Sequence, residues 1–77
     1  MLTYACLDPV KRFRIKGLTF EVFVHNLWGQ ETYEMSVFRG EREIDLDGQF
    51  SSIEKARGWA TVNADKLVAI FDRDAAR

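Results

Sequence analysis

The chain has 77 residues, which is enough for one small domain spanning residues 1–77 with a single hydrophobic core. Hydrophobic residues make up 47% of the sequence, too large a share for a disordered chain. Eleven Lys and Arg against twelve Asp and Glu give a net charge of -1. This balance argues against a general nucleic-acid binder, because such proteins carry a basic excess.

The rest of the composition narrows the class further. One Cys excludes an internal disulfide, and one Cys with one His argues against a closed zinc site. No apolar run approaches the roughly 18–20 residues of a membrane span, and the first residues lack the basic-then-apolar order of a signal peptide. We therefore expect a cytoplasmic protein without a metal site, a cofactor or membrane contact.

Alternating apolar and charged residues predict a series of short strands after an N-terminal segment, residues 1–10. Residues 12–16 read Arg-Phe-Arg-Ile-Lys, a strand with one buried face. The alternation changes parity at Gly17, which indicates a tight turn or a bulge. Residues 26–31 have the composition of a hairpin loop, and Gly40 indicates a second tight turn. The strands predicted for this antiparallel meander are residues 12–16, 18–25, 32–39 and 41–47.

The period of the pattern changes after residue 50. Ser51-Ser52-Ile53-Glu54 reads as a capping box, with Ser51 as the N-cap and Glu54 at the third helical position. An amphipathic helix is predicted over residues 52–72, with Asn63 as a point at which it could break. Its repeating face consists of Ile53, Ala56, Trp59, Ala60, Asn63, Leu67, Ile70 and Phe71. We therefore expect an α+β fold, a three- to four-stranded antiparallel sheet with a C-terminal helix packed on one face.

If the helix covers one face of the sheet, the alternation places a largely polar set of side chains on the other. We expect this set to be Arg12, Arg14, Lys16, Thr19, Glu21, Phe23, His25, Glu34, Ser36, Phe38, Glu43, Asp45 and Asp47. Its basic residues come from the first strand and many of its acids from the last, so the near-zero net charge conceals two regions of opposite charge. Cross-strand pairing with acids such as Glu21 is the alternative explanation, although exposed pairs contribute only about 0–1 kcal/mol each.

The last strand carries an acid at every second position, namely Glu41, Glu43, Asp45 and Asp47. Side chains on one face of a strand repeat at roughly 6.5–7 Å, which is close to the spacing of phosphates along a nucleic-acid strand. The row therefore suits a Lys/Arg groove or another basic partner reached by electrostatic steering. The alternative is a charged, solvated edge strand that blocks edge-to-edge aggregation.

Aromatic residues are the third feature of this face. Phe23 and Phe38 are expected to point away from the helix, and with Leu27 and Trp28 at the hairpin loop they could form an exposed apolar patch, a common mark of a protein interface. In the alternative arrangement the segment Met1–Val10, which contains Leu2, Tyr4 and Leu7, folds over the face and buries them.

These features favour a non-enzymatic protein-binding inhibitor or adaptor, because no phosphate loop, nucleophile elbow or paired-Cys motif is present. Acids would steer the encounter and aromatics would supply desolvated contacts. In size and organisation the chain resembles the small proteins with which phages and mobile elements disable host machinery, anti-CRISPR proteins among them. The resemblance implies that Glu41, Glu43, Asp45 and Asp47 engage Lys/Arg of a DNA-binding groove in a CRISPR effector subunit and block DNA.

A second hypothesis is a nucleic-acid-binding module. A three-stranded sheet followed by a helix that opens Gly48-Gln49-Phe50-Ser51-Ser52-Ile53-Glu54-Lys55-Ala56 resembles the small DNA-binding domains at the N-termini of phage-type integrases, in which the sheet enters the major groove. The resemblance implies contacts from Arg12, Arg14, Lys16 and Arg39, and the acidic last strand would oppose them by repelling phosphate. A third hypothesis is a structural or toxin–antitoxin-like partner that pairs through a sheet edge. Either exposed face could also form an isologous dimer, so the oligomeric state stays open.

Overall fold

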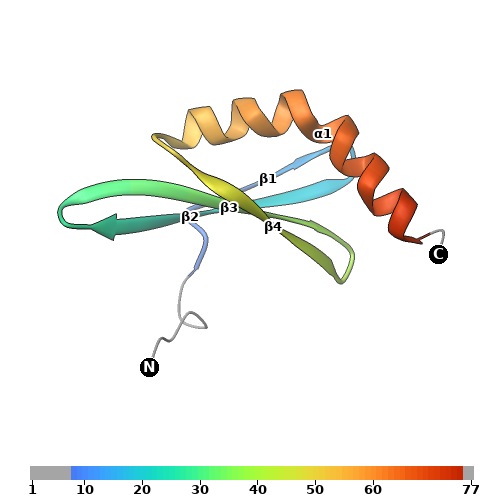
Figure 1. The fold of residues 1–77 in the computed structure, drawn as a ribbon, viewed down its shortest axis with the longest axis horizontal. Coiled ribbons are helices and arrows are strands. Elements are labelled where there is room, and N and C mark those ends of the chain that lie inside the picture. The colour runs from blue at the N-terminus through green and yellow to red at the C-terminus, as the bar shows by residue number, and fades with distance from the viewer. Residues whose placement is uncertain (1–7, 76–77) are drawn as a thin grey trace.

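The period-two alternation within residues 11–50 becomes a four-stranded antiparallel sheet, and the helical repeat that follows becomes one helix across it (Figure 1). The computed structural model describes residues 8–75. The strands lie side by side in chain order, so the meander and the α+β fold class expected from the sequence are confirmed. The elements are β1 (Lys11–Ile15), β2 (Leu18–Leu27), β3 (Gln30–Arg39), β4 (Arg42–Phe50) and α1 (Ile53–Ala75).

Each connection between strands is a two-residue turn. The central residues of the first turn, Lys16 and Gly17, have φ of 53° and 81°, and those of the second, Trp28 and Gly29, have φ of 57° and 79°. Two successive positive φ values are typical of a type I′ turn, whose twist matches that of the flanking strands. The six-residue loop expected over 26–31 is therefore wrong, because the strands continue on both sides of the turn.

Strand β4 is longer than the predicted residues 41–47 because it contains a register shift. Met35 lies opposite Leu46, but Tyr33, two residues away on β3, lies opposite Phe50, four residues away on β4. The two additional residues are accommodated at Gly48, whose φ is 112°. Because the shift is even, Phe50 stays on the helix side, where its ring meets Trp59 of α1 edge to face at 6.1 Å.

The core lies between α1 and one face of the sheet. It contains Phe13, Leu18, Phe20, Val22, Met35 and Val37 from the sheet, and Ala56, Ala60, Leu67 and Phe71 from the helix. Small alanines in the first half of α1 let the helix approach the sheet closely, and Phe71 fills the space in the second half. Trp59 and Ile70, both expected on the apolar face, are 36% and 39% exposed and so border the core.

The helix begins one residue later than expected. The backbone N–H of Lys55 donates to the Ser52 hydroxyl at 3.1 Å, which identifies Ser52 as the N-cap and places Lys55 at the third helical position. The capping box expected for Ser51 and Glu54 is therefore wrong by one position. The break considered at Asn63 does not occur, since its side-chain amide donates to the Trp59 carbonyl at 2.9 Å within a continuous helix.

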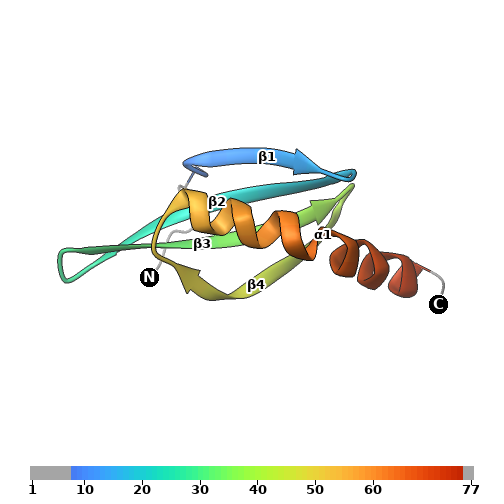
Figure 2. The same ribbon diagram turned by 90° about the horizontal axis from the view of Figure 1, so that it is seen from above.

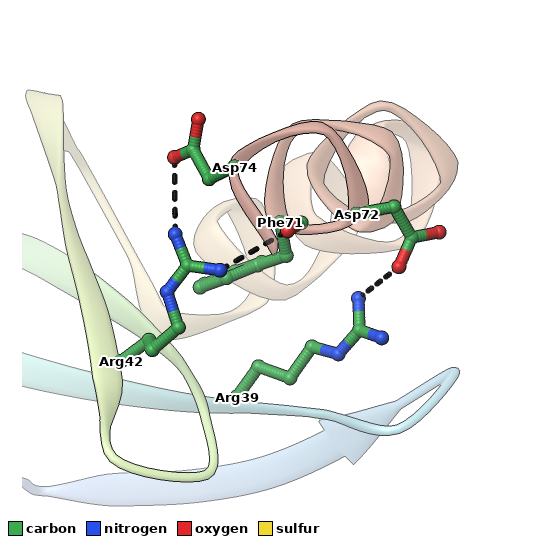
Figure 3. Close-up of polar contacts among 5 residues, drawn as sticks. All are labelled: Arg39, Arg42, Phe71, Asp72 and Asp74. Atoms are coloured by element: carbon green, nitrogen blue, oxygen red, sulfur yellow. Dashed lines mark hydrogen bonds and ion pairs between the residues drawn. The ribbon is translucent and has the colours of Figure 1, made fainter. Parts of the chain in front are cut away.

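Ion pairs connect the C-terminal half of α1 to residues in or beside the turns at one end of the sheet. Arg39, at the end of β3, pairs with Asp72, and Arg42, at the start of β4, pairs with Asp74 at 3.1 Å (Figure 3). Lys16, in the β1–β2 turn, pairs with Asp65. Figure 2 shows α1 crossing the sheet obliquely, with its last turns passing beyond the strand ends. The helix therefore packs on one face of the sheet, and the other face is the candidate surface for binding.

Candidate protein-binding face

The second face of the sheet, which we call the open face, is covered by no helix or strand among residues 8–75 (Figure 1). The strand registers place on it alternate residues of all four strands. They are Arg12, Arg14, Thr19, Glu21, Phe23, His25, Thr32, Glu34, Ser36, Phe38, Glu43 and Asp45. Most residues expected on this face are therefore there, and the exceptions are described below.

Charge changes sign from one side of the open face to the other. One row runs across all four strands through Arg12, Glu21, Ser36 and Asp45, each opposite the next. A neighbouring row runs through Arg14, Thr19, Phe38 and Glu43 in the same way. Both rows begin with an arginine on β1 and end with a carboxylate on β4, so the two regions of opposite charge expected from the sequence occupy opposite edges of one surface.

The acidic side of the open face is hollowed. A shallow depression of about 640 Å³ extends over β2, β3 and β4. Its open-face lining is Phe23, His25, Glu34, Ser36, Glu43 and Asp45. It combines a half-buried aromatic ring with three carboxylates, the composition that suits a basic side chain bearing an aliphatic stem.

Glu43 and Asp45 influence each other at the rim of this depression. The Ser36 hydroxyl donates to Asp45 at 3.0 Å, and Ser36 is the buried polar residue of the described chain, at 8% exposure. Partial desolvation raises the pKa of the Glu43 carboxyl above its usual range, and the neighbouring Asp45 carboxylate raises it further. The charge of Glu21 acts in the same direction, while the Ser36 hydroxyl opposes it. A cation brought to this rim would relieve the repulsion.

Two ion pairs flank the acidic group. His25 Nε2 lies 3.1 Å from a carboxylate oxygen of Glu34, and Arg12 contacts Glu21 at 2.8 Å. The sequence showed no acidic partner for His25. Its partner is diagonal to it across the β2–β3 hairpin, because His25 lies opposite Thr32 and Glu34 is two residues further along β3, so the pair depends on the register between strands rather than on spacing within one strand.

The acidic ladder is shorter than expected. Glu41 lies in the β3–β4 turn rather than in the strand, and the side chain of Asp47 lies outside the described part of the structure. The expected four-residue row is therefore wrong, and Glu43 and Asp45 are the two members that occupy successive positions of the open face. Together with Glu21 and Glu34 from neighbouring strands they make a compact group, which we call the acidic cluster.

The aromatic residues do not form one patch. Phe38 is opposite Thr19, four residues from Phe23 along β2, so about 13 Å of strand length and a polar row separate the two positions. Trp28 is about 16 Å beyond Phe23, at the tip of the β2–β3 hairpin, where it is 93% exposed. Figures 1 and 2 show this hairpin extending past the other strands. Phe23 and Phe38 are half buried within the open face, and Trp28 is a separate feature.

The possible covering of these rings by Met1–Val10 falls mainly outside the described residues. Leu2, Tyr4 and Leu7 belong to the part that is not described. Within the described part, the Val10 N–H donates to the carbonyl of Val22, the residue opposite Lys11, at 2.8 Å, and the Val10 side chain is 46% exposed.

The four basic residues considered for nucleic-acid binding do not share a surface. Lys16 and Arg39 reach Asp65 and Asp72 of α1 on the helix side, so the expectation that Lys16 lies on the open face is wrong. The positive φ of Lys16 explains the error, since the residue belongs to the turn and leaves the alternation of β1. Arg12 and Arg14 are on the open face, and Arg12 is already paired with Glu21.

Comparisons of the chain with protein-family models, with curated proteins and with solved structures found no match in any of the three. The described part of the chain has no helix with both the length and the apolar character needed to cross a membrane. Among residues 8–75 no group of three or more His, Cys, Asp or Glu is arranged to hold a metal ion. We therefore argue the function from the open face.

Proposed function

We propose that this protein is a non-enzymatic binding module that recognises a basic surface of a cytoplasmic partner protein through the acidic cluster of its open face. The observation that supports this most directly is the depression that combines Phe23 with Glu34, Glu43 and Asp45 on a face that no described element covers. Carboxylates attract the partner and fix its orientation, while the ring supplies apolar contact to the stem of a Lys or Arg.

Crowding among the acids supports the same function. The pKa of Glu43 is raised first by partial desolvation and then by the neighbouring Asp45 carboxylate, so its negative charge is disfavoured in the free protein. A Lys or Arg of the partner would remove that repulsion on binding, so part of the electrostatic gain is specific to the complex. Glu21 and Glu34 already have Arg12 and His25 as partners within the fold, so this gain comes from Glu43 and Asp45.

Inhibition by occupancy is the mode of action that we propose for this module. A cluster of four carboxylates on three adjacent strands suits a Lys/Arg groove in which the partner would otherwise hold phosphates. This keeps the steric mechanism implied by the resemblance to anti-CRISPR proteins, but it replaces a strand-long row of phosphate mimics by a compact cluster. The partner class is accordingly a nucleic-acid-binding effector of the host.

The experiment is a pull-down from host lysate with the full chain and with Glu43→Lys/Asp45→Lys, followed by titration of the purified captured protein. The expected result is loss of capture by the reversed variant and retention by Glu31→Lys/Glu54→Lys, which changes the net charge equally at exposed positions outside the cluster. Excess duplex DNA is expected to compete for the purified partner. Equal capture by both variants would remove the acidic cluster from the mechanism.

A mobility-shift assay at low salt addresses the alternative of direct nucleic-acid binding. No shift of duplex or single-stranded DNA is expected, because the acids of the open face repel phosphate and two of the four candidate cations lie on the helix side. A shift that disappears in Arg12→Glu/Arg14→Glu would favour the nucleic-acid module instead.

A further inference from the structure

The two outer strands of the sheet are complementary in charge. Strand β1 places Arg12 and Arg14 on the open face, and β4 places Glu43 and Asp45 there. Among residues 8–75 no strand pairs with the outer edge of either. Figure 2 shows β1 and β4 as the two borders of the sheet. The molecule therefore carries a basic edge on one side and an acidic edge on the other.

The turns determine which main-chain groups of these edges are free. In a two-residue hairpin the residues flanking the turn form a hydrogen-bonded pair, and bonded and non-bonded pairs then alternate along the strands. The flanking pairs are Ile15 with Leu18 and Arg39 with Arg42. Counting outward from them, the N–H and C=O groups that point away from the sheet belong to Arg12 and Arg14 on β1 and to Glu43 and Asp45 on β4.

The strand directions allow these edges to meet. Because four antiparallel strands lie in chain order, β1 and β4 run in opposite directions. A second copy placed beside β4 in the same orientation presents its β1 antiparallel to β4, with its helix on the same side of the extended sheet. One register then places Glu43 opposite Arg14 of the second copy, and Asp45 opposite Arg12. In both pairs the free N–H and C=O groups of the two strands can bond to each other, and the side chains carry opposite charges.

The same register also places apolar residues of the two copies opposite each other on the helix side of the sheet. Ile44 falls between Glu43 and Asp45, so it lies opposite Phe13 of the second copy. Ile44 is a half-buried residue at the border of the core, and the ring of Phe13 is covered from α1 by the guanidinium of Arg57 at 5.4 Å. Apolar residues therefore face one another across the junction on one side, and ion pairs form on the other.

We propose that copies of this chain associate head to tail, with the acidic β4 edge of one copy pairing as an antiparallel strand with the basic β1 edge of the next. Symmetric dimers are disfavoured. Pairing β4 with β4 of a second copy would place carboxylates opposite carboxylates, and pairing β1 with β1 would place arginines opposite arginines. A head-to-tail interface repeats, so association continues beyond a dimer as an open or closed array.

This association does not rest on the proposed partner binding, but the two share Glu43 and Asp45. A basic partner seated on the acidic cluster would remove the charges to which the next copy binds. The substitution Phe23→Ala separates the two, since Phe23 lies in the depression and away from both edges. It is expected to weaken partner binding and to leave self-association unchanged.

The test measures the mass of the full chain by sedimentation equilibrium over a wide concentration range at low and high salt. The wild-type mass is expected to rise beyond a dimer with concentration, and to rise less at high salt. In Glu43→Lys/Asp45→Lys both edges are basic, and in Arg12→Glu/Arg14→Glu both are acidic. Each variant alone is expected to lose about tenfold or more in association constant.

Mixing the two variants is the decisive step. An equimolar mixture is expected to associate again, because each variant supplies the complementary edge that the other has lost. The matched controls Glu31→Lys/Glu54→Lys and Lys55→Glu/Lys66→Glu change charge at exposed positions away from both edges and should associate as the wild type does. A wild type that is monomeric throughout, association that stops at a dimer, or a mixture no larger than its components would overturn the proposal.

A second readout uses the wild type alone, because Arg12→Glu places a like charge beside Glu21 and could unfold the chain. Amide exchange with water should slow with protein concentration at Arg12, Arg14, Glu43 and Asp45, whose N–H groups become bonded. The amides of Phe13 and Ile44 already bond within the sheet and should not change. Concentration-independent exchange at all four edge amides would also overturn the proposal.

Discussion

Arg42 contacts Phe71 in two ways. Its guanidinium lies over the ring at 5.6 Å from the centroid, and it donates to the Phe71 main-chain carbonyl at 3.1 Å (Figure 3). Phe71 is fully buried, and its carbonyl lies one turn before the end of α1. One side chain at the start of β4 therefore covers a core ring and makes a hydrogen bond to the main chain of the helix.

Arg42→Ala is expected to lower the free energy of unfolding by about 1–3 kcal/mol, because it removes a cation–π contact and a side-chain hydrogen bond to a partly buried carbonyl. Arg42→Lys should recover part of the loss, since an ammonium retains the charge but not the planar fork that reaches ring, carbonyl and Asp74 together. Urea unfolding measures both. Arg73→Ala, at an exposed position of the same helix end, is the control and should change stability by less than about 0.5 kcal/mol.

The start of α1 offers a matched pair of substitutions. Ser52→Ala should destabilise the protein by about 1 kcal/mol, because the Ser52 hydroxyl accepts the N–H of Lys55. Ser51→Ala removes an exposed hydroxyl with no such bond and should cost no more than a few tenths of a kcal/mol. Thermal unfolding followed by circular dichroism distinguishes them. A larger loss for Ser51→Ala would contradict the assignment of Ser52 as the N-cap.

The fold was accessible from the sequence because its two signals are periodic. Alternation from Phe13 to Leu46 placed nearly every strand residue on the correct face, and the three- and four-residue repeat located α1. The predictions were wrong at positions where the backbone departs from regular strand or helix geometry. Lys16 and Trp28 adopt left-handed conformations that their residue types do not indicate, and the register shift at Gly48 has no signal in hydropathy.

The candidate site could be predicted from the sequence only in part, because alternation along a strand does not show how neighbouring strands align. Glu43 and Asp45 follow from strand parity alone, so they were found. The depression and the His25–Glu34 pair depend on the register between strands, which the two-residue turns set. Arg39 could not be assigned either, because its contact with Asp72 joins positions 33 residues apart. Alternation along one strand shows which face of the sheet a residue occupies, but the register between strands is needed to identify its neighbours.

Replacing Trp28 is expected to increase the stability of the protein and to weaken partner binding. It holds a φ of 57° with its side chain almost fully exposed, so the fold gains little contact from a ring in a backbone region that bulky residues avoid. Trp28→Asn is expected to raise the free energy of unfolding by about 1 kcal/mol, because Asn-Gly is the preferred type I′ sequence. Gly29→Ala, at a φ of 79°, should lower it by a similar amount.

If Trp28 contacts the partner, as the sequence suggested, the stabilised Trp28→Asn variant will bind the partner more weakly. Urea unfolding and titration with the captured partner measure the two effects separately. A stabilised variant with unchanged affinity would remove Trp28 from the interface and leave the acidic cluster as the binding site.

Glu43 should make the stability of the protein depend on pH in an unusual direction for an acid. Its folded-state pKa lies above the ordinary 4.5, so the folded chain holds this proton more tightly than the unfolded chain. The resulting stabilisation is present below pH 4.5 and is lost as pH rises through the folded-state pKa. At neutral pH the ionised group is partly desolvated and is repelled by Asp45 and Glu21, which destabilises the fold.

Glu43→Gln should therefore be more stable than the wild type at pH 7, by no more than about 1 kcal/mol because the side chain is exposed, and the difference should vanish toward pH 4. Urea unfolding between pH 3.5 and 7 measures it. Glu31→Gln, on the same sheet but outside the acidic cluster, should show no such trend. A Glu43→Gln variant that is less stable at pH 7 would mean that this carboxylate is held by attraction, and the case for a crowded site awaiting a cation would fail with it.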